Sequence, residues 1–497
     1  MSELGAYQLP PPPPPAVPRP AASVVLWRPG PRGLDLYLVR RGATQRFAPG
    51  FTAFPGGRRD AEDDAVPVNA PGANAPSDLA CAARELFEEA GVLVVTGEAL
   101  HPTALAGHRA SLLAGRLGFA ALLAELGAAV DGSRFVDAGR WVTPPVYALR
   151  FDAANFLVEW RPRDAPSVWP GELADGAWVS AASALGEWSR GARYFLPPNL
   201  WPVRVLARGP APDLEALRRP EPAAYRNEYQ QGLWQVPLKT PTLPPATHTN
   251  CWVVDLGDRV AVVDPGSPYL EEQARLDRFL GILAAEGRPA REVWLTHGHA
   301  DHVGGVAALA ARGLTIRAHR GIAPRLPGVL FKPLRDGELL GGRYGVLFTP
   351  GHARDHVVFQ DEETGALLVG DMLSTLSTVV IDPPEGDMAE YERQLARLAA
   401  LGPAALYPAH GQPAIDGVAA LRACLAHRAE REAKILEALR EPGRLGEITE
   451  RAYADVAPAI WPVAERSGLA VLLKLQAQGR AAEVDGRWRL SAAATAT

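Results

Sequence analysis

Three histidines and an aspartate lie within six residues in the second half of the sequence. His297, His299 and His302 are three of only 11 histidines among 497 residues, and Asp301 directly precedes the third. They follow the apolar run 293–295, which is typical of a strand, so a tight loop at a strand end can direct them at one point. Imidazole nitrogens and carboxylate oxygens suit Zn²⁺ and similar ions. The spacing therefore predicts a metal site rather than a polar surface loop that happens to be rich in histidine.

Further potential ligands follow other apolar runs or tight turns downstream. They are His352 in Thr-Pro-Gly-His, Asp371 after the run 367–370, and His410 in Tyr-Pro-Ala-His-Gly. Upstream, another apolar run ends at Asp264, in an Asp-Pro-Gly turn. Together these residues resemble the metallo-β-lactamase superfamily.

The resemblance implies an αββα sandwich with the ligands on loops at one sheet edge. It also implies two Zn²⁺ or other divalent transition ions, which activate water and polarise the attacked group, so hydrolysis is expected. The implied ligands are His297, His299 and His352 for one ion and Asp301, His302 and His410 for the other, with Asp371 bridging and Asp264 orienting the loop. Asp301 is further expected to help position the nucleophile. His356 is not a ligand in the family pattern, so it either supports the ligands, faces the substrate, or is an ordinary polar histidine.

A second cluster of charged residues lies in the first half of the sequence. Glu85, Glu88 and Glu89 fall on one face of an expected helix, for which Ser77 is a candidate N-cap and Gly91 a candidate C-terminal stop. Repulsion between these carboxylates would be relieved by a hard cation such as Mg²⁺. On the glutamates alone, an ordinary solvated acidic helix face is the better interpretation.

The residues around the glutamates change that interpretation. Gly56-Gly57 precede them, and the order from Arg84 to Val92 is Arg-Glu-Leu-Phe-Glu-Glu-Ala-Gly-Val. This resembles the Nudix box, except that Asp63 stands where the family has Glu and a Pro/Gly/Asn-rich run, 66–76, lengthens the loop.

The resemblance to the Nudix family implies an α/β/α sandwich that cleaves a diphosphate with Mg²⁺ or Mn²⁺. Glu85, Glu88 and Glu89 would bind the metal, Glu85 would act in catalysis, and Arg84 would support the ligands. The insertion and its flanking segments resemble the branch that includes peroxisomal coenzyme A diphosphatases.

The length of the chain and its 47% apolar content predict two or three domains. We expect a proline-rich leader at 1–20, a Nudix domain at 21–208, a linker or wrapping segment at 209–247, a lactamase-like domain at 248–423 and a winged helix at 424–492. The Ala/Leu-rich stretch 104–130 is interrupted by charges, which predicts a helical insertion rather than a membrane span.

The last segment has helical spacing at 427–439, 447–453 and 463–478, followed by a hairpin with an Asp-Gly turn at 485–486. Three helices and a β-wing resemble a winged-helix domain. Together with the His352 to Asp371 spacing, they resemble the lactamase-beta-like-2 branch, whose members are associated with cleavage of single-stranded RNA. Between His427 and Leu490, however, 11 Lys/Arg stand against 10 Asp/Glu. Phosphate binding needs clustered positive charge, so a packing or dimerisation role stays open.

The net charge of −5 gives no global attraction to nucleic acid or to anionic membranes. The three cysteines, Cys81, Cys251 and Cys424, are scattered, and no secretory signal is visible, so a cytoplasmic location is expected. We therefore expect a bifunctional hydrolase. The first site would take a nucleotide or coenzyme A-type substrate, and the second would act as a thioesterase like the glyoxalase II relatives or as an RNA endonuclease. A metal-dependent scaffold without activity would have lost ligands, and the main ligands are present. The oligomeric state is left open.

Overall fold

A computed structural model describes residues 16–45, 47–70, 75–97, 102–145, 149–162, 165–169 and 171–491. The chain divides into two compact units, 13–234 and 235–497, and the division falls within strand β11 (Leu233–Lys239). Most of the expected leader lies outside the described residues. Within the described ranges, the helices are too short or too polar to cross a membrane.

The first unit is built on a seven-stranded mixed sheet with the order β3-β2-β1-β8-β7, in which β4 also pairs with β1 and β9 with β2. Its central strand β1 (Arg19–Gly30) turns directly into the antiparallel β2 (Gly33–Arg41) and runs parallel to β8 (Phe151–Glu159). The other strands of the unit are β3 (Thr52–Ala53), β4 (Gly56–Arg58), β7 (Val136–Val142) and β9 (Leu173–Ser180), with a separate pair formed by β5 (Val68–Asn69) and β6 (Val130–Asp131).

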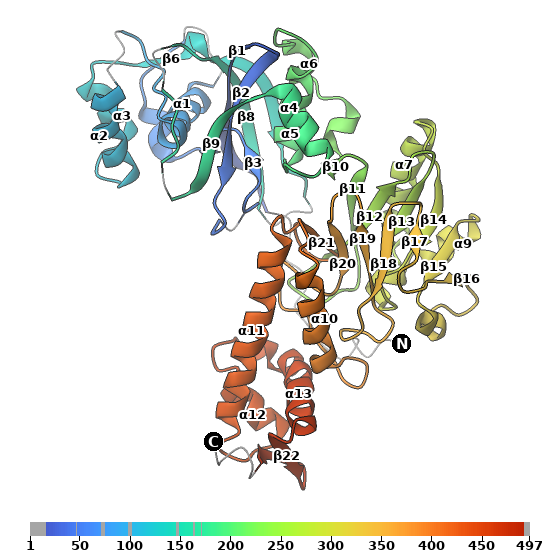
Figure 1. The fold of residues 1–497 in the computed structure, drawn as a ribbon. Coiled ribbons are helices and arrows are strands. Elements are labelled where there is room, and N and C mark those ends of the chain that lie inside the picture. The colour runs from blue at the N-terminus through green and yellow to red at the C-terminus, as the bar shows by residue number, and fades with distance from the viewer. Residues whose placement is uncertain are drawn as a thin grey trace. The chain divides into compact units, whose positions relative to one another are not determined.

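Helices cover both faces of this sheet (Figure 1). Successive side chains of a strand point to opposite faces. Val24 and Leu26 therefore pack with Leu86 of helix α1, whereas Val25 packs with Trp201 of helix α5. The helices of the unit are α1 (Pro76–Ala90), α2 (Pro102–Leu113), α3 (Phe119–Glu125), α4 (Ala181–Ser189), α5 (Pro197–Leu206) and α6 (Leu214–Arg218), with 3-10 turns η2 (Ala61–Ala65), η3 (Gly132–Arg134) and η4 (Pro222–Tyr225).

Two local expectations differ from the structure. Helix α1 begins at Pro76 with Ala75 at the N-cap position, so the expectation for Ser77 is wrong; a proline in the first turn has no N–H that needs an acceptor. The helical insertion expected at 104–130 is confirmed and consists of two helices, α2 and α3. The segment 209–247 contains α6, η4 and two strands, because its apolar residues, such as Tyr229 and Trp234, are buried. The expected stop at Gly91 is confirmed, since Gly91 has the left-handed conformation with φ 70°.

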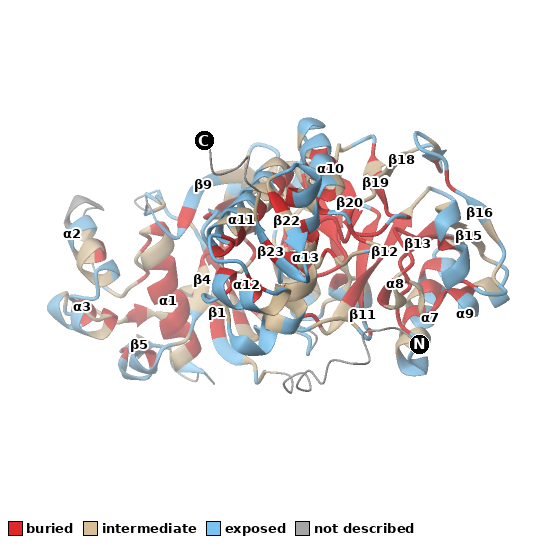
Figure 2. Cartoon of the chain, turned by 90° about the horizontal axis from the view of Figure 1, so that it is seen from below, coloured by how far each residue is buried: buried red, intermediate tan, exposed pale blue. Residues whose placement is uncertain are grey.

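The second unit contains two stacked sheets. Within this unit, the first runs from the end of β11 through β12-β13-β14-β15-β16, and the second has the order β17-β18-β19-β20-β21. Trp294 of β14 contacts Tyr344 of β18 and Phe359 of β19, with ring centroids 5.5 and 5.4 Å apart, so large aromatic rings fill the space between the sheets. Figure 2 shows these strands as largely buried.

Strand β10 (Asn227–Gln230) belongs to 13–234. Apart from the end of β11, the strands of the second unit's two sheets are β12 (His248–Asp255), β13 (Val260–Val263), β14 (Ala290–Trp294), β15 (Thr315–Ala318), β16 (Phe331–Pro333), β17 (Leu339–Leu340), β18 (Tyr344–Phe348), β19 (Val357–Asp361), β20 (Leu367–Gly370) and β21 (Leu406–Pro408). The helices are α7 (Leu270–Ala285), α8 (Ala300–Val303), α9 (Val306–Ala311), the 3-10 turn η5 (Arg320–Arg325) and α10 (Met388–Ala400).

The C-terminal part consists of α11 (Gly417–Ala438), α12 (Leu445–Ala452), the 3-10 turn η6 (Pro458–Ile460), α13 (Trp461–Ala477) and the hairpin of β22 (Ala481–Val484) and β23 (Arg487–Leu490). The expected three helices and hairpin are confirmed. Asp485 and Gly486 both have positive φ, which a tight two-residue hairpin turn requires. One hydrophobic cluster includes Val369 of β20, Leu395 of α10 and Leu472 of α13, so the C-terminal helices share a core with the second sheet.

Candidate metal centres

The histidine-rich loop begins where strand β14 ends, beside the parallel strand β13. His297 and His302 are buried and His299 is partly exposed. A side chain on Gly298 would collide with Arg325 and Asp355, since its Cβ would lie 2.7 Å from one and 2.9 Å from the other. The glycine therefore lets the loop pass close to neighbouring side chains while its two flanking histidines turn inward.

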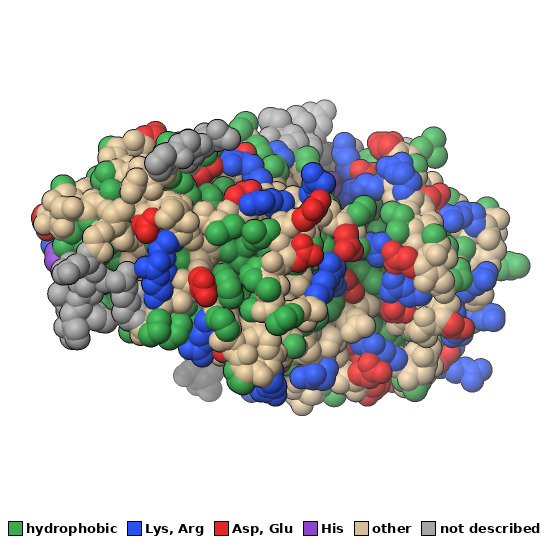
Figure 3. Space-filling view, turned by 90° about the horizontal axis from the view of Figure 1, so that it is seen from above, with side chains coloured by type: hydrophobic (Ala, Val, Ile, Leu, Met, Phe, Trp, Pro, Cys, Tyr) green, Lys and Arg blue, Asp and Glu red, His purple; other side chains and the backbone are tan. Residues whose placement is uncertain are grey.

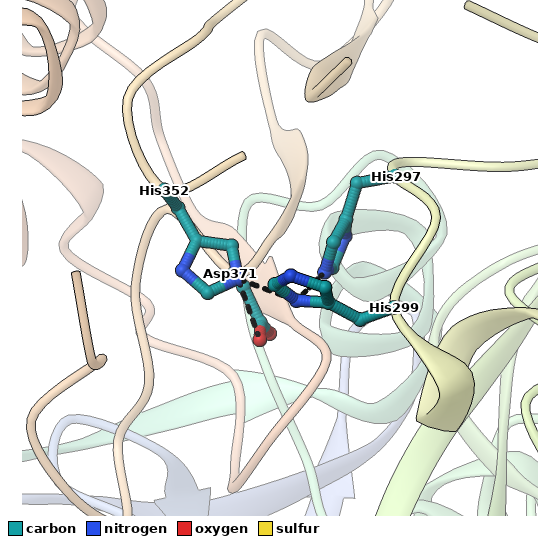
Figure 4. A group of neighbouring side chains, drawn as sticks. All are labelled: His297, His299, His352 and Asp371. Atoms are coloured by element: carbon teal, nitrogen blue, oxygen red, sulfur yellow. Dashed lines mark hydrogen bonds and ion pairs between the residues drawn. The ribbon is translucent and has the colours of Figure 1, made fainter. Parts of the chain in front are cut away.

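Four predicted ligands form the first group: His297, His299, His352 and Asp371 (Figure 4). One ligand atom from each lies within 4.8 Å of the others. Nδ1 of His299 lies 2.9 Å from Nε2 of His297 and 3.0 Å from Nε2 of His352, and the latter nitrogen is 3.5 Å from Oδ2 of Asp371. Three ring nitrogens and a carboxylate oxygen thus face one point.

The second group consists of Asp301, His302 and His410. Nε2 of His410 lies 3.4 Å from Oδ2 of Asp301. Oδ1 of Asp371 lies 3.5 Å from Nε2 of His410 and 3.7 Å from Nε2 of His302, whereas its Oδ2 faces His352. The carboxylate of Asp371 therefore presents one oxygen to each group.

The electrostatics of the first group favour the protonation states that metal binding needs. Burial, with neighbouring histidines, holds the pKa of His297 well below its usual 6.5 and lowers that of His352 to about 4. Burial alone would raise the pKa of Asp371, but His410 and His302 outweigh it and hold that pKa well below 3.8. Neutral imidazoles beside an ionised carboxylate form a ligand set suited to a divalent cation.

The second group carries excess negative charge around its histidines. Burial would lower the pKa of His302, but Asp264, Asp371 and Asp301 raise it well above 6.5. Among the described residues, Nε2 of His302 and Oδ1 of Asp371 are buried polar atoms without a hydrogen-bond partner. Buried polar atoms are rarely left so. A divalent ion would satisfy both atoms and replace the proton, so the residues fit a metal.

Hydrogen bonds fix the ring orientation of three predicted ligands. Oδ2 of Asp264 lies 2.9 Å from Nδ1 of His302 and accepts from the Thr296 hydroxyl at 2.6 Å, while its Oδ1 accepts from the Thr296 amide at 2.8 Å. Nδ1 of His352 donates to the Val380 carbonyl, and Nδ1 of His410 to the His248 carbonyl, at 3.0 and 3.1 Å. In each case a proton on Nδ1 leaves Nε2 free as a ligand atom. The roles of Val380 and His248 were missed, because they act through backbone oxygens that carry no sequence signal.

His356 belongs to neither group. Its Nε2 accepts from the backbone amide of Asp371 at 3.1 Å, and its Nδ1 lies 2.8 Å from the Thr349 hydroxyl. It is therefore a buried residue that supports the position of Asp371.

In the first unit, the three predicted glutamates lie on helix α1 around Arg84. The Arg84 guanidinium donates to Glu85 at 2.8 Å and to Glu88 at 3.3 Å. Glu89 accepts from the Gly56 amide at 2.8 Å. Within the described ranges, these glutamates do not form a group as tight as the two above. Arg84 instead serves as the positive charge between them.

Asp63 anchors this arrangement. It is 1% exposed and accepts two hydrogen bonds from Arg84, at 2.8 and 3.0 Å. Asp63, which stands where the family has Glu, is therefore an acid that orients Arg84. The spacing of Asp63 from Gly57 was the sequence signal for this role.

Burial dominates the electrostatics of the glutamates. It raises the pKa of Glu85 to about 7 and, with the neighbouring Glu85 charge, raises that of Glu89 well above 4.5. A Cβ on Gly57 would lie 2.6 Å from the Glu85 carboxylate, so the backbone of 56–57 packs directly against it. Buried carboxylates with raised pKa values favour a nearby cation, so the residues fit a hard divalent ion.

Comparisons with known proteins agree with the geometry of the second unit. The sequence model of the metallo-beta-lactamase superfamily matches residues 244–410, and that of the beta-lactamase associated winged helix domain matches residues 445–488. The lactamase-like protein nscB of Aspergillus fumigatus is 32% identical over 245 residues, which cover 45% of this chain and 71% of that protein. The atrochrysone carboxyl ACP thioesterase AgnL7 of Paecilomyces divaricatus is 30% identical, over 42% of this chain and 66% of that protein.

Among solved structures, a NUDIX hydrolase from Alicyclobacillus acidocaldarius is 29% identical, with a TM-score of 0.35, over 41% of this chain and 97% of that one. The family assignment depends on the lactamase-like relatives and on the two matched sequence models. On these grounds, the chain belongs to the metallo-beta-lactamase superfamily, and its C-terminal part is the winged-helix domain associated with it.

Proposed function

We propose that this chain is a bifunctional hydrolase with a two-metal thioesterase centre in the second unit and a diphosphatase centre on helix α1. The observation that carries the first part is the convergence of two ligand groups on Asp371, whose two carboxylate oxygens face one group each. A hydrolase is what membership of the superfamily implies.

In the second unit, seven side chains would hold two Zn²⁺ or similar ions. His297, His299 and His352 would bind one ion, Asp301, His302 and His410 the other, and Asp371 both. When bound, such a pair supplies Lewis-acid polarisation of the scissile carbonyl and activation of water. The chain's own residues orient the ligands, because Asp264 and the backbone carbonyls of 380 and 248 keep the protons of the ligand histidines on Nδ1.

A thioester is the substrate class that we propose for this centre. A relative 30% identical to this chain is named an ACP thioesterase. The net charge of −5 gives no global attraction to a long nucleic-acid strand. Basic and acidic side chains are interspersed on the face shown in Figure 3, whereas a bound RNA strand needs clustered positive charge.

In the first unit, Glu85, Glu88 and Glu89 would hold Mg²⁺ or Mn²⁺, with Glu85 acting in catalysis. When bound, the ion supplies neutralisation of diphosphate charge and activation of water. Arg84 holds Glu85 and Glu88 in place and is itself held by Asp63. The proposed substrate is a nucleoside diphosphate derivative such as coenzyme A, which would link this centre to a thioesterase acting on acyl derivatives of the same carrier.

Two double variants of the full-length protein test both parts. Glu88→Gln with Glu89→Gln is expected to abolish cleavage of coenzyme A in Mg²⁺ and to leave thioester hydrolysis intact. His297→Ala with Asp301→Ala is expected to abolish hydrolysis of acyl-coenzyme A thioesters in Zn²⁺ and to leave cleavage of coenzyme A in Mg²⁺ intact. His427→Ala removes a histidine of α11 outside both ligand groups and serves as the matched control.

Single-stranded RNA is assayed in parallel. If the wild-type protein cleaves RNA and not thioesters, and the His297/Asp301 variant loses that cleavage, the centre is correct and the thioester assignment is wrong. If both double variants keep every wild-type activity, both site assignments fail.

A further inference from the structure

Residues 379–385, termed the connecting segment, lie between Asp371 and helix α10. Its first residue, Val379, is buried, and Ile381 is fully buried. The segment contacts the C-terminal helices, and it also contacts two of the predicted ligand histidines.

On the C-terminal side, α11 and α13 hold three positions of the segment. The guanidinium of Arg428 on α11 donates to the Val379 carbonyl at 2.6 Å. The hydroxyl of Ser467 on α13 accepts from the Ile381 amide at 3.1 Å. Arg466, also on α13, donates two hydrogen bonds to the Asp382 carboxylate, at 2.5 and 2.7 Å, in the planar geometry that fixes both partners.

On the metal side, the same segment contacts two predicted ligands. The Val380 carbonyl, between the positions held by Arg428 and Ser467, accepts from Nδ1 of His352 at 3.0 Å. Three residues after Asp382, the Glu385 carboxylate lies 3.5 Å from Nε2 of His299 and pairs with Arg325 at 2.5 Å. Both histidines belong to the first ligand group, with His297 and Asp371.

The packing makes this connection stiff. Arg428 is only 5% exposed, and its guanidinium lies 5.1 Å from the ring centroid of Tyr391 on α10. Lys474 of α13 also pairs with Glu392 of α10. A close-packed interior transmits small displacements, so a shift of α13 would move the Val380 carbonyl and with it the His352 ring.

We propose that the winged-helix domain is a positioning element of the metal centre, in which Arg466 and Ser467 fix the connecting segment and thereby orient His352 and His299. This inference rests on the proposed two-metal centre. It gives the domain a role that needs no nucleic acid. It also makes a selective prediction, because the segment touches ligands of the first group, whereas the ring of His410 is held by the His248 carbonyl and that of His302 by Asp264.

The test measures Zn²⁺ affinity by competition with a chromophoric chelator, in two backgrounds of the full-length protein. His410→Ala disables the second ligand group, so Zn²⁺ affinity in that background reports on the first group. His352→Ala disables the first group, so affinity in that background reports on the second. Into each background we would introduce Ser467→Ala with Arg466→Gln. Arg480→Gln is the matched control, because Arg480, between α13 and β22, pairs with Glu432 of α11 and not with the segment.

The double variant is expected to weaken Zn²⁺ binding by about tenfold in the His410→Ala background, the lower end of the effect of losing partners that orient ligands. It should change binding less than twofold in the His352→Ala background, and Arg480→Gln should leave both unchanged. Asp382→Asn, which breaks the same ion pair from the other side, should reproduce the selective loss, and Arg466→Lys should restore part of the affinity. Thermal unfolding of each variant identifies those that fail to fold.

An equal loss of Zn²⁺ affinity in both backgrounds would overturn the inference, since it would mark a general structural effect. Unchanged Zn²⁺ affinity in both backgrounds would also overturn it. A wild-type protein that binds no Zn²⁺ would instead refute the proposed two-metal centre. The two failures are therefore distinguishable.

Discussion

Replacement of Asp264 by asparagine tests how the metal centre is oriented. Asp264 is 2% exposed and has a φ of 50°. Asparagine tolerates this left-handed conformation, so the backbone need not change. The side chain keeps its size and Oδ1, which accepts from the Thr296 amide. What changes is Oδ2, which faces the Thr296 hydroxyl at 2.6 Å and Nδ1 of His302 at 2.9 Å.

The magnitude follows from these contacts. Hydrogen bonds to a charged group contribute about 1.5–3 kcal/mol each, and two are lost at Oδ2. An amide N–H at that place can donate to the Thr296 hydroxyl and to Nδ1 of His302, which recovers part of the loss. We expect a net destabilisation of about 2 kcal/mol.

The effect on metal binding has a different cause. An amide donor opposite Nδ1 favours the tautomer that carries its proton on Nε2, the atom that faces Asp371. Nε2 is then no longer a ligand atom, and affinity at the second group should fall roughly 10- to 100-fold.

The assay is chelator competition with Zn²⁺, combined with thermal unfolding in a chelator to separate stability from binding. Asp258→Asn, at an exposed residue paired with Arg259, is the control and should change neither quantity. The reasoning would be refuted by Asp264→Asn protein that binds two Zn²⁺ ions with wild-type affinity, since no ligand tautomer would then depend on Asp264.

The remaining predictions concern charge pairs away from the lactamase-like centre. Arg84→Met leaves buried Asp63 without its counter-ion and should lower the free energy of unfolding of the first unit by about 3–5 kcal/mol, measured by urea denaturation. Glu432→Gln should make stability less sensitive to acid. Burial would raise the pKa of Glu432, but Lys474 and Arg480 outweigh it and hold that pKa below 4.5. The wild-type pair therefore stabilises the folded state above about pH 4.5 and loses that contribution as the pH falls through the lowered pKa, whereas the variant has no such contribution to lose.

The control for Arg84→Met comes from an exposed pair. Arg58→Met breaks an exposed pair with Asp60 and should cost less than about 1 kcal/mol. A loss as small for Arg84→Met would show that Asp63 is not held by a buried ion pair. For Glu432→Gln, unfolding curves at pH 3 to 7 that fall as steeply with acid as those of the wild type would contradict the prediction.

The proximity of the candidate ligands in the second unit could be predicted from sequence because each follows a strand or a tight turn. The three histidines of the stretch 297–302 are close in sequence, so no long-range contact is needed to see that they converge. Asp264 was equally visible, since Asp-Pro-Gly after an apolar run marks a strand end. The contacts of Val380 and His248 could not be found, because any residue has a carbonyl oxygen and only the fold decides which one meets an imidazole.

The proline-rich segment 209–247 shows another limit. Its prolines were interpreted as a sign of a linker, yet Pro222 begins the 3-10 turn η4 and Pro237 lies within strand β11. Proline is tolerated at the start of a helix and at strand positions whose amide is not needed in the ladder. The aromatic residues between these prolines are buried, and that burial is what makes the segment part of the fold. Composition alone does not reveal it.

The two clusters balance buried charge in different ways, and this bears on how they would use metal. At the glutamates, Arg84 already supplies a fixed positive charge between Glu85 and Glu88, so the fold does not depend on a cation. At the second ligand group, positive charge comes from protons on histidines whose pKa values the surrounding aspartates raise. A proton is displaced by a divalent ion, whereas a covalently attached guanidinium is not. We therefore expect metal to bind tightly and release protons in the second unit, and to bind weakly and reversibly at the proposed site beside Arg84.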